Sequence, residues 1–175
     1  GNTDSVRKEG VTSVAYKLSK YHNKPKFDIE ILPSNIILND SAWSIGQSTI
    51  TYTLADQVMD IDNFSLSTDY QLITADGTAS KSATDSIDVV LNNINLDYLL
   101  SYTEASKAIS ILGPVTGKAK VYRVFSEPML EAQAYIPNGG LNGVYPGDVT
   151  AEATLDSENN SILLYGQIVD STQHM

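Results

Sequence analysis

Two groups of acidic side chains are the residues whose type and spacing come nearest to a reactive site. Asp56, Asp60 and Asp62 form one group, and Asp85 and Asp88 form the other. Carboxylate oxygens are ligands that calcium prefers, and paired carboxyls serve as acid and base in glycoside hydrolysis. The calcium-loop pattern fails because no glycine follows Asp60 at the required position. We therefore expect both groups to lie on solvated strand faces and turns.

Other catalytic constellations lack their side chains. The chain has no cysteine, and its histidines are His22, beside a turn, and His174, near the terminus. Nucleophile–base pairs, zinc sites and haem sites need converging His or Cys side chains. The glycine-rich stretch 139–143 has neither the Lys nor the following helix pattern of a phosphate-binding loop, so it reads as a hairpin turn. The sequence predicts a protein that is not an enzyme and uses no cofactor or metal.

Charge and hydropathy limit the classes of molecule that we expect the chain to bind. The formal net charge is -10 and the sequence pI is about 4.4, which would repel a phosphate backbone, so we expect no nucleic-acid partner. No stretch reaches the roughly 18 consecutive apolar residues of a membrane span. The chain begins with Gly1 instead of Met and opens on a polar run, and we expect it to be a segment of a longer protein.

The dominant pattern is alternation of apolar and polar residues, which places apolar side chains on one face of a strand. The runs at 14–18 and 27–31 predict two neighbouring antiparallel strands. A change of spacing between Ile61 and Phe64 predicts a bulge at Asp62 and Asn63. The pattern predicts an all-β protein: a curved, mainly antiparallel sheet, such as an open sandwich, of about eleven strands.

One segment departs from alternation. Leu96, Leu99, Leu100 and Thr103 recur at helical spacing after a possible N-cap at Asn95, which predicts one short helix. The predicted organisation is a flexible leader over 1–10, a first β layer over 11–92, the helix and a linker over 93–112, and a second run of strands in the same domain over 113–170. The pairs Gly139-Gly140, Asn142-Gly143, Pro146-Gly147 and Asn159-Asn160 are typical of the turns between the later strands.

The last four predicted strands carry apolar faces that are large at the strand ends and small in the middle. Small residues lined up across neighbouring strands would form an apolar trough, and close-packed interiors do not tolerate large voids. Two fillers remain open: the helix or a facing sheet, or an elongated apolar ligand such as an acyl chain. The predicted lining is Gly117, Ala119, Val121, Leu130, Ala132, Ala134, Ile136, Val149, Ala151, Ala153, Leu155, Ile162, Leu164 and Ile168.

Three stretches carry a resemblance to a known family. The first contains WSI at 43–45, IDNFSL at 61–66, QLI at 71–73 and DGTA at 76–79; the second contains DSIDV at 85–89 and LNNINL at 91–96; the third contains LG at 112–113, GKA at 117–119, PMLEA at 128–132 and YPGDV at 145–149. Together they resemble the C-terminal part of the TamB family, the translocation and assembly module proteins of the AsmA-like superfamily.

The resemblance implies a groove-shaped β-sheet, called a β-taco, in the periplasm of a two-membrane bacterium, as part of an inner-membrane-anchored protein. It also implies an outer-membrane barrel protein as partner, phospholipid transport between membranes, a role in outer-membrane protein assembly, and no catalytic residues. The chain departs from the family in length, because it is far shorter than a complete member and shows no N-terminal anchor sequence.

The predicted function is a non-catalytic segment of a bridge-like protein whose apolar groove conducts phospholipid, with acyl chains and the rest of its own longer chain as partners. A β-sandwich binding or adhesion module, for example one that binds carbohydrate, is the alternative, since ten tyrosines could supply aromatic stacking faces. A structural spacer without a ligand is the third possibility.

Overall fold

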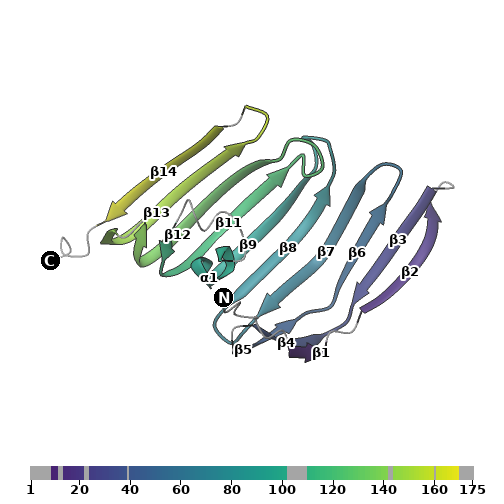
Figure 1. Cartoon of the computed structure of the whole chain (residues 1–175), viewed down its shortest axis with the longest axis horizontal. Helices are drawn as coiled ribbons and strands as arrows, with labels where there is room; N and C mark the ends of the chain where they lie inside the picture. Colours follow the sequence, from purple (N-terminus) through teal and green to yellow (C-terminus); the bar gives the residue numbers. More distant parts are fainter. Residues whose placement is uncertain are drawn as a thin grey trace, which may run out of the picture.

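The described part of the chain forms one open, curved antiparallel β-sheet (Figure 1). A computed structural model describes residues 9–11, 14–21, 24–38, 40–101, 110–141, 144–159 and 161–169. Fourteen strands belong to the sheet, and one helix, α1 (Leu96–Leu100), lies beside it. The all-β class, the curved sheet and the single short helix are confirmed.

The strands in chain order are β1 (Glu9–Val11), β2 (Val14–Tyr21), β3 (Lys24–Ile31), β4 (Ser34–Leu38), β5 (Ser41–Ile45), β6 (Ser48–Thr53), β7 (Val58–Ser67), β8 (Leu72–Ala79), β9 (Ser86–Asn95), β10 (Ile111–Leu112), β11 (Pro114–Tyr122), β12 (Met129–Leu141), β13 (Val144–Asp156) and β14 (Ser161–Val169). The count exceeds the predicted eleven partly because β1 and β10 are too short to show an alternating pattern.

The sheet runs from β2 at one edge through β3, β6, β7, β8, β9, β11, β12 and β13 to β14 at the other. Near the first edge it forks, because the first half of β7 pairs with β6 and its second half pairs with β5. Strands β5, β4 and β1 continue from that second half. The predicted pairing of the first two alternating runs is confirmed, since Tyr16 lies opposite Ile29 in β2 and β3.

The predicted bulge in β7 is confirmed. Register against β8 shifts between Ile61 and Phe64, and Asn63 has a positive φ of 59°. The backbone N–H of Asn63 donates a hydrogen bond of 2.7 Å to Asp76 on β8. The bulge restores parity, so that Ile61 and Phe64 both keep their side chains on the apolar face of the sheet.

Two of the residue pairs predicted as turns, Gly139-Gly140 and Pro146-Gly147, lie inside strands instead. Gly139 and Gly140 belong to β12, and Gly147, whose φ is 137°, belongs to β13. The β12–β13 register shifts on both sides of Gly139, and a Cβ there would approach Ile136 Cγ2 to 2.4 Å. The glycines therefore permit bulges and close packing, and the turn predicted at 142–143 lies outside the described residues.

The two predicted runs of strands belong to one continuous sheet. Strands from 11–92 and from 113–170 are continuous through the β9–β11 pairing. Residues 9 and 10, which the sequence predicted within the flexible leader, belong to β1; residues 1–8 lie outside the described residues. Within the described part, no helix is long and apolar enough to cross a membrane.

Candidate functional site

A strip of small side chains crosses the last four strands in two adjacent rows. Gly117, Ala134, Ala151 and Gly166 lie side by side on β11, β12, β13 and β14. The neighbouring row contains Ala119, Ala132, Ala153 and Leu164. Because neighbouring strands are about 4.8 Å apart, each row is about 14 Å long. The pairing places the predicted trough residues together on one face, which we call the apolar face.

Larger side chains flank this strip toward both strand ends. Val121, Leu130 and Leu155 share a row with Ile162 on one side. On the other side Ile136 lies opposite Val149, which lies opposite Ile168. The side chains of Ile162, Leu164 and Ile168 lie outside the described part, so only their backbone positions in β14 are placed.

The apolar face continues beyond the strands that the sequence singled out. Gly117 lies opposite Leu91 on β9, and Leu91 lies opposite Ile73 on β8. The parallel row passes from Ala119 through Val89 to Ala75. Phe64 and Leu66 extend the two rows onto β7. The strip is therefore one end of a face that spans the sheet.

No second layer covers most of this face within the described residues. Val121, Leu130, Leu155 and the alanines of the strip are each partly exposed to solvent. The strongly buried apolar residues near them are Val115, Ile136 and Val149, with relative exposures of 1%, 2% and 0%. The facing sheet that could have filled the trough is absent from the described part.

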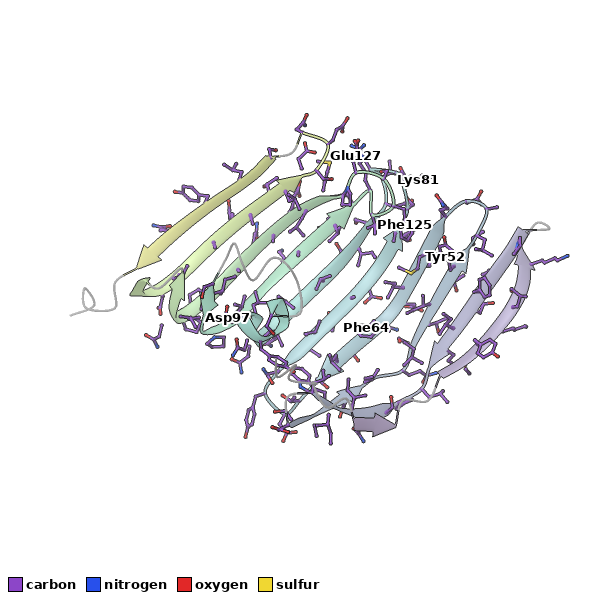
Figure 2. The ribbon with its side chains drawn as sticks, viewed as in Figure 1. Tyr52, Phe64, Lys81, Asp97, Phe125 and Glu127 are labelled. Carbon is purple, nitrogen blue, oxygen red and sulfur yellow. The ribbon has the colours of Figure 1, made fainter. Side chains whose placement is uncertain are left out.

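The predicted helix closes only one end of the strands. Leu96 of α1 and Ile111 of β10 pack with Ala134 around the buried cluster of Val115, Ile136 and Val149. Asp97, in the first turn of α1, accepts a 3.2 Å hydrogen bond from the backbone N–H of Ile111. This bond fixes α1 to β10, and Figure 2 shows Asp97 at that end of the sheet. We call α1 and β10 the cap.

An aromatic contact lies at the opposite strand end. Phe125, in the turn between β11 and β12, meets Tyr52 of β6 edge to face, with ring centroids 6.3 Å apart and planes at 83° (Figure 2). Tyr52 belongs to the apolar face because it shares a row with Met59 and Ala79. The β11–β12 turn thus folds over three intervening strands, and the Phe125 backbone N–H donates a 3.0 Å bond to the Ser80 carbonyl.

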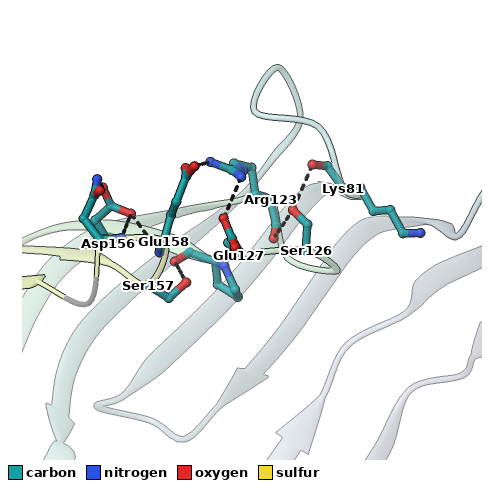
Figure 3. A network of polar contacts seen from close by, with 9 residues as sticks. Lys81, Arg123, Ser126, Glu127, Asp156, Ser157 and Glu158 are labelled. Atoms are coloured by element: carbon teal, nitrogen blue, oxygen red, sulfur yellow. Dashed lines mark hydrogen bonds and ion pairs between the residues drawn. The ribbon is translucent and has the colours of Figure 1, made fainter.

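Polar contacts hold this turn to its neighbours (Figure 3). Arg123 pairs with Glu158 at 2.7 Å and with Glu127 at 3.2 Å, and the hydrogen bond to Glu158 raises the pKa of Arg123 most. Ser126 donates a 3.0 Å bond to the Lys81 carbonyl. The contacts join the β8–β9, β11–β12 and β13–β14 turns. We call these three linked turns the rim. The sequence did not predict the rim, and its one signal was an aromatic residue, Phe125, in a polar turn.

The cap and the Phe125 turn give the apolar face two walls. They stand at opposite ends of β11 and β12 and are separated by roughly six residues of strand, or about 20 Å. Between them the face of small and branched side chains runs across the strands. The apolar face is thus bounded at both strand ends, and an elongated apolar molecule on it would lie across the strands.

A hollow of about 530 Å³ lies on the opposite, polar face of the same strands. Its lining includes Lys118, Lys120, Glu131, Gln133 and Glu152. Lys120 pairs with Asp88 at 3.6 Å. The hollow is therefore separate from the predicted groove, and its mixed charges suit water better than an acyl chain.

Two of the acidic residues considered for calcium accept hydrogen bonds from nearby hydroxyl groups. Asp60 accepts a 2.6 Å bond from Thr78, and Asp85 accepts a 2.8 Å bond from Ser80. Among the residues that the structure describes, no group of three or more His, Cys, Asp or Glu side chains could hold a metal ion. His22 and His174 lie outside those residues.

Comparison of the chain with protein-family models, with curated proteins and with solved structures found no match.

Proposed function

We propose that this chain is a non-catalytic segment of a periplasmic bridge-like protein, and that its apolar face conducts phospholipid between membranes and supports outer-membrane protein assembly. The observation that carries the proposal is an apolar face that stays in register from β7 to β14 and remains partly exposed between the cap and the Phe125 turn. The resemblance of the three sequence stretches to the TamB family supplies the cellular setting and the barrel partner.

The attraction for lipid is hydrophobic. Burial of each acyl CH₂ group contributes about 0.8 kcal/mol, so contact of even part of a chain with the face is favourable. This attraction has no preferred direction. A lipid can therefore slide along the rows without breaking specific bonds, which suits transport better than tight capture.

The small side chains leave space above the centre of the apolar face. Ala132, Ala134, Ala151 and Ala153 occupy the centre of the strip, and each leaves room that a larger side chain would fill. The polar face of the same strands carries Gln133 and Thr150, both exposed. The two faces therefore offer matched positions one residue apart on the same strands.

Native mass spectrometry and lipid extraction from the purified chain test the proposal. We expect phospholipid to co-purify with the chain. We expect Ala134→Trp and Ala151→Trp to reduce the amount severalfold, because the indole ring fills the space that each alanine leaves on the apolar face. Gln133→Trp and Thr150→Trp are the controls and should leave lipid content unchanged. Equal retention by all four variants, or no lipid in the parent chain, would count against a conduit and favour the structural spacer.

The alternative of a β-sandwich binding module needs two packed sheets. The described residues supply one sheet. Its exposed tyrosines do not gather at one loop end, since Tyr16, Tyr70, Tyr135 and Tyr165 lie on different strands and turns.

A further inference from the structure

The two outermost strands of the long sheet carry unusually exposed apolar side chains. On β2, Tyr16 is 82% exposed and Leu18 is 64% exposed; on β14, Leu163 is 69% exposed and Tyr165 is 66% exposed. Apart from Tyr70, no large apolar side chain in the described part is as exposed as these four. Within that part, β2 pairs only with β3 and β14 only with β13. Both edges therefore present unpaired backbone beside exposed apolar side chains, on the apolar face at β2 and on the polar face at β14, which is a template for another strand.

Opposite charges collect at the two edges. Past Arg123 the sequence contains no Lys or Arg, and its acidic residues there are Glu127, Glu131, Asp148, Glu152, Asp156, Glu158 and Asp170. At the other end the edge strand β2 contains Lys17 and Lys20 and no acidic residue, and the charges of β3 balance, with Lys24 and Lys26 against Asp28 and Glu30. The β14 edge is therefore acidic and the β2 edge basic, so the edges attract each other and each repels its own kind.

Strand direction and facing also match. Every neighbouring pair on the ten-strand path from β2 to β14 is antiparallel, so the first and the tenth strand point in opposite directions. A second copy displaced along the sheet would set its β2 antiparallel to β14. Tyr16 and Leu18 would then lie on the same face as the small-residue strip, because they share its parity across the sheet.

We propose that the β2 edge of one copy of this chain pairs with the β14 edge of a second copy, and that the apolar face continues across the junction. The favoured register sets Tyr16 opposite Gly166, which puts an aromatic ring over a strand glycine. Leu18 then lies opposite Leu164, and Lys17 lies beside Tyr165 in the row that contains Glu152. The two patches differ, so the contact does not close and chains of copies form. This inference does not depend on lipid binding.

Disulfide trapping tests the register, since the chain contains no cysteine. A Cβ at Gly166 would come no closer than 3.9 Å to the Thr150 carbonyl oxygen, so Gly166→Cys is sterically tolerated. Residues directly opposite in antiparallel strands have Cβ atoms about 5 Å apart, which is close enough for a disulfide after small adjustments.

An equimolar mixture of the Tyr16→Cys and Gly166→Cys chains should give a crosslinked dimer on mild oxidation, identified by non-reducing electrophoresis and peptide mass spectrometry. The control mixture pairs Tyr16→Cys with Val90→Cys, since Val90 is exposed on β9 away from both edges. At least a fivefold excess over the control supports the proposal. Equal yields would overturn it.

Sedimentation velocity of the unmodified chain and of charge variants provides the second test. We expect association that rises with concentration and weakens about twofold for Lys17→Glu or Glu152→Lys alone, because each change removes part of the attraction between edges whose charges lie two strands apart and not in direct contact. Mixing the two variants should restore association between them. A chain that stays monomeric at every concentration, with trapping no better than the control, would overturn the pairing of two copies.

Discussion

Gly117→Ala should separate β11 from β12 at the centre of the small-residue strip. The new Cβ would lie 2.1 Å from the Gln133 carbonyl oxygen and 2.9 Å from the Ala134 Cα. Ordinary van der Waals contact begins near 3.4 Å, so the two strands must move apart by about 1.3 Å. Both obstacles are backbone atoms, and no side-chain rotation can relieve them.

The cost follows from the contact. Overpacking of a tight site destabilises by about 1–3 kcal/mol, and each weakened ladder hydrogen bond contributes about 1 kcal/mol. We expect Gly117→Ala to lower the free energy of unfolding by about 1–3 kcal/mol, measured in urea titrations followed by far-ultraviolet circular dichroism. Gly166→Ala is the matched control because its nearest contact is 3.9 Å, and it should change stability by less than about 0.5 kcal/mol. Equal effects of the two substitutions would refute the proposed strand spacing.

Three further predictions concern the cap, the rim and pH. Ile136→Ala should cost about 2–5 kcal/mol in the same titration because it empties the core under the cap; a cost below about 1 kcal/mol would contradict that core. Phe125→Ala should increase hydrogen exchange at the Phe125 turn and leave exchange at Ile136 unchanged, since it removes the ring contact with Tyr52. Desolvation raises the pKa of Asp28, but hydrogen bonds from Thr51 and Ser19 and the charge of Lys26 outweigh it, so the pKa lies below 3.8. The stability from this carboxylate is present above pH 3.8 and is lost as pH falls through the lowered pKa, so Asp28→Asn should flatten the fall of melting temperature below about pH 4; an unchanged slope there would contradict it.

Alternation carried most of the information that the sequence held about the fold. Runs such as 27–31 and 130–136 placed apolar residues on one face, and pairing in the structure joins these faces in rows. The bulge beside Asn63 was predictable because a change of spacing is visible in one strand. Strands β1 and β10 were not, because three and two residues cannot establish a period.

The turns predicted at the glycines were wrong where strand pairing outweighed local composition. Gly139 and Gly147 have the composition of turns, yet they accommodate bulges within the long strands β12 and β13. What decides between the two is the pairing of β12 with β13, whose register shifts on both sides of Gly139, and a short window of sequence does not contain that pairing. The contact between Phe125 and Tyr52 was not predictable for the same reason, since the two residues are far apart in the sequence and only the order of strands in the sheet brings them together.

The candidate site was predictable as a set of positions but not as a shape. The strip residues were identified from their small size on alternating positions, and their grouping on one face follows from strand register. Whether a second layer would cover them depended on packing that alternation does not encode, because sandwich and open sheet share the same pattern.

Photocrosslinking with a phospholipid that carries a diazirine on its acyl chain, mapped by peptide mass spectrometry, tests the central claim most directly. Lipid on the apolar face predicts crosslinks with a period of two on β12, at Leu130, Ala132 and Ala134 and not at Glu131 or Gln133. Crosslinks divided equally between the two faces, or confined to the polar hollow around Lys118 and Glu152, would contradict the account.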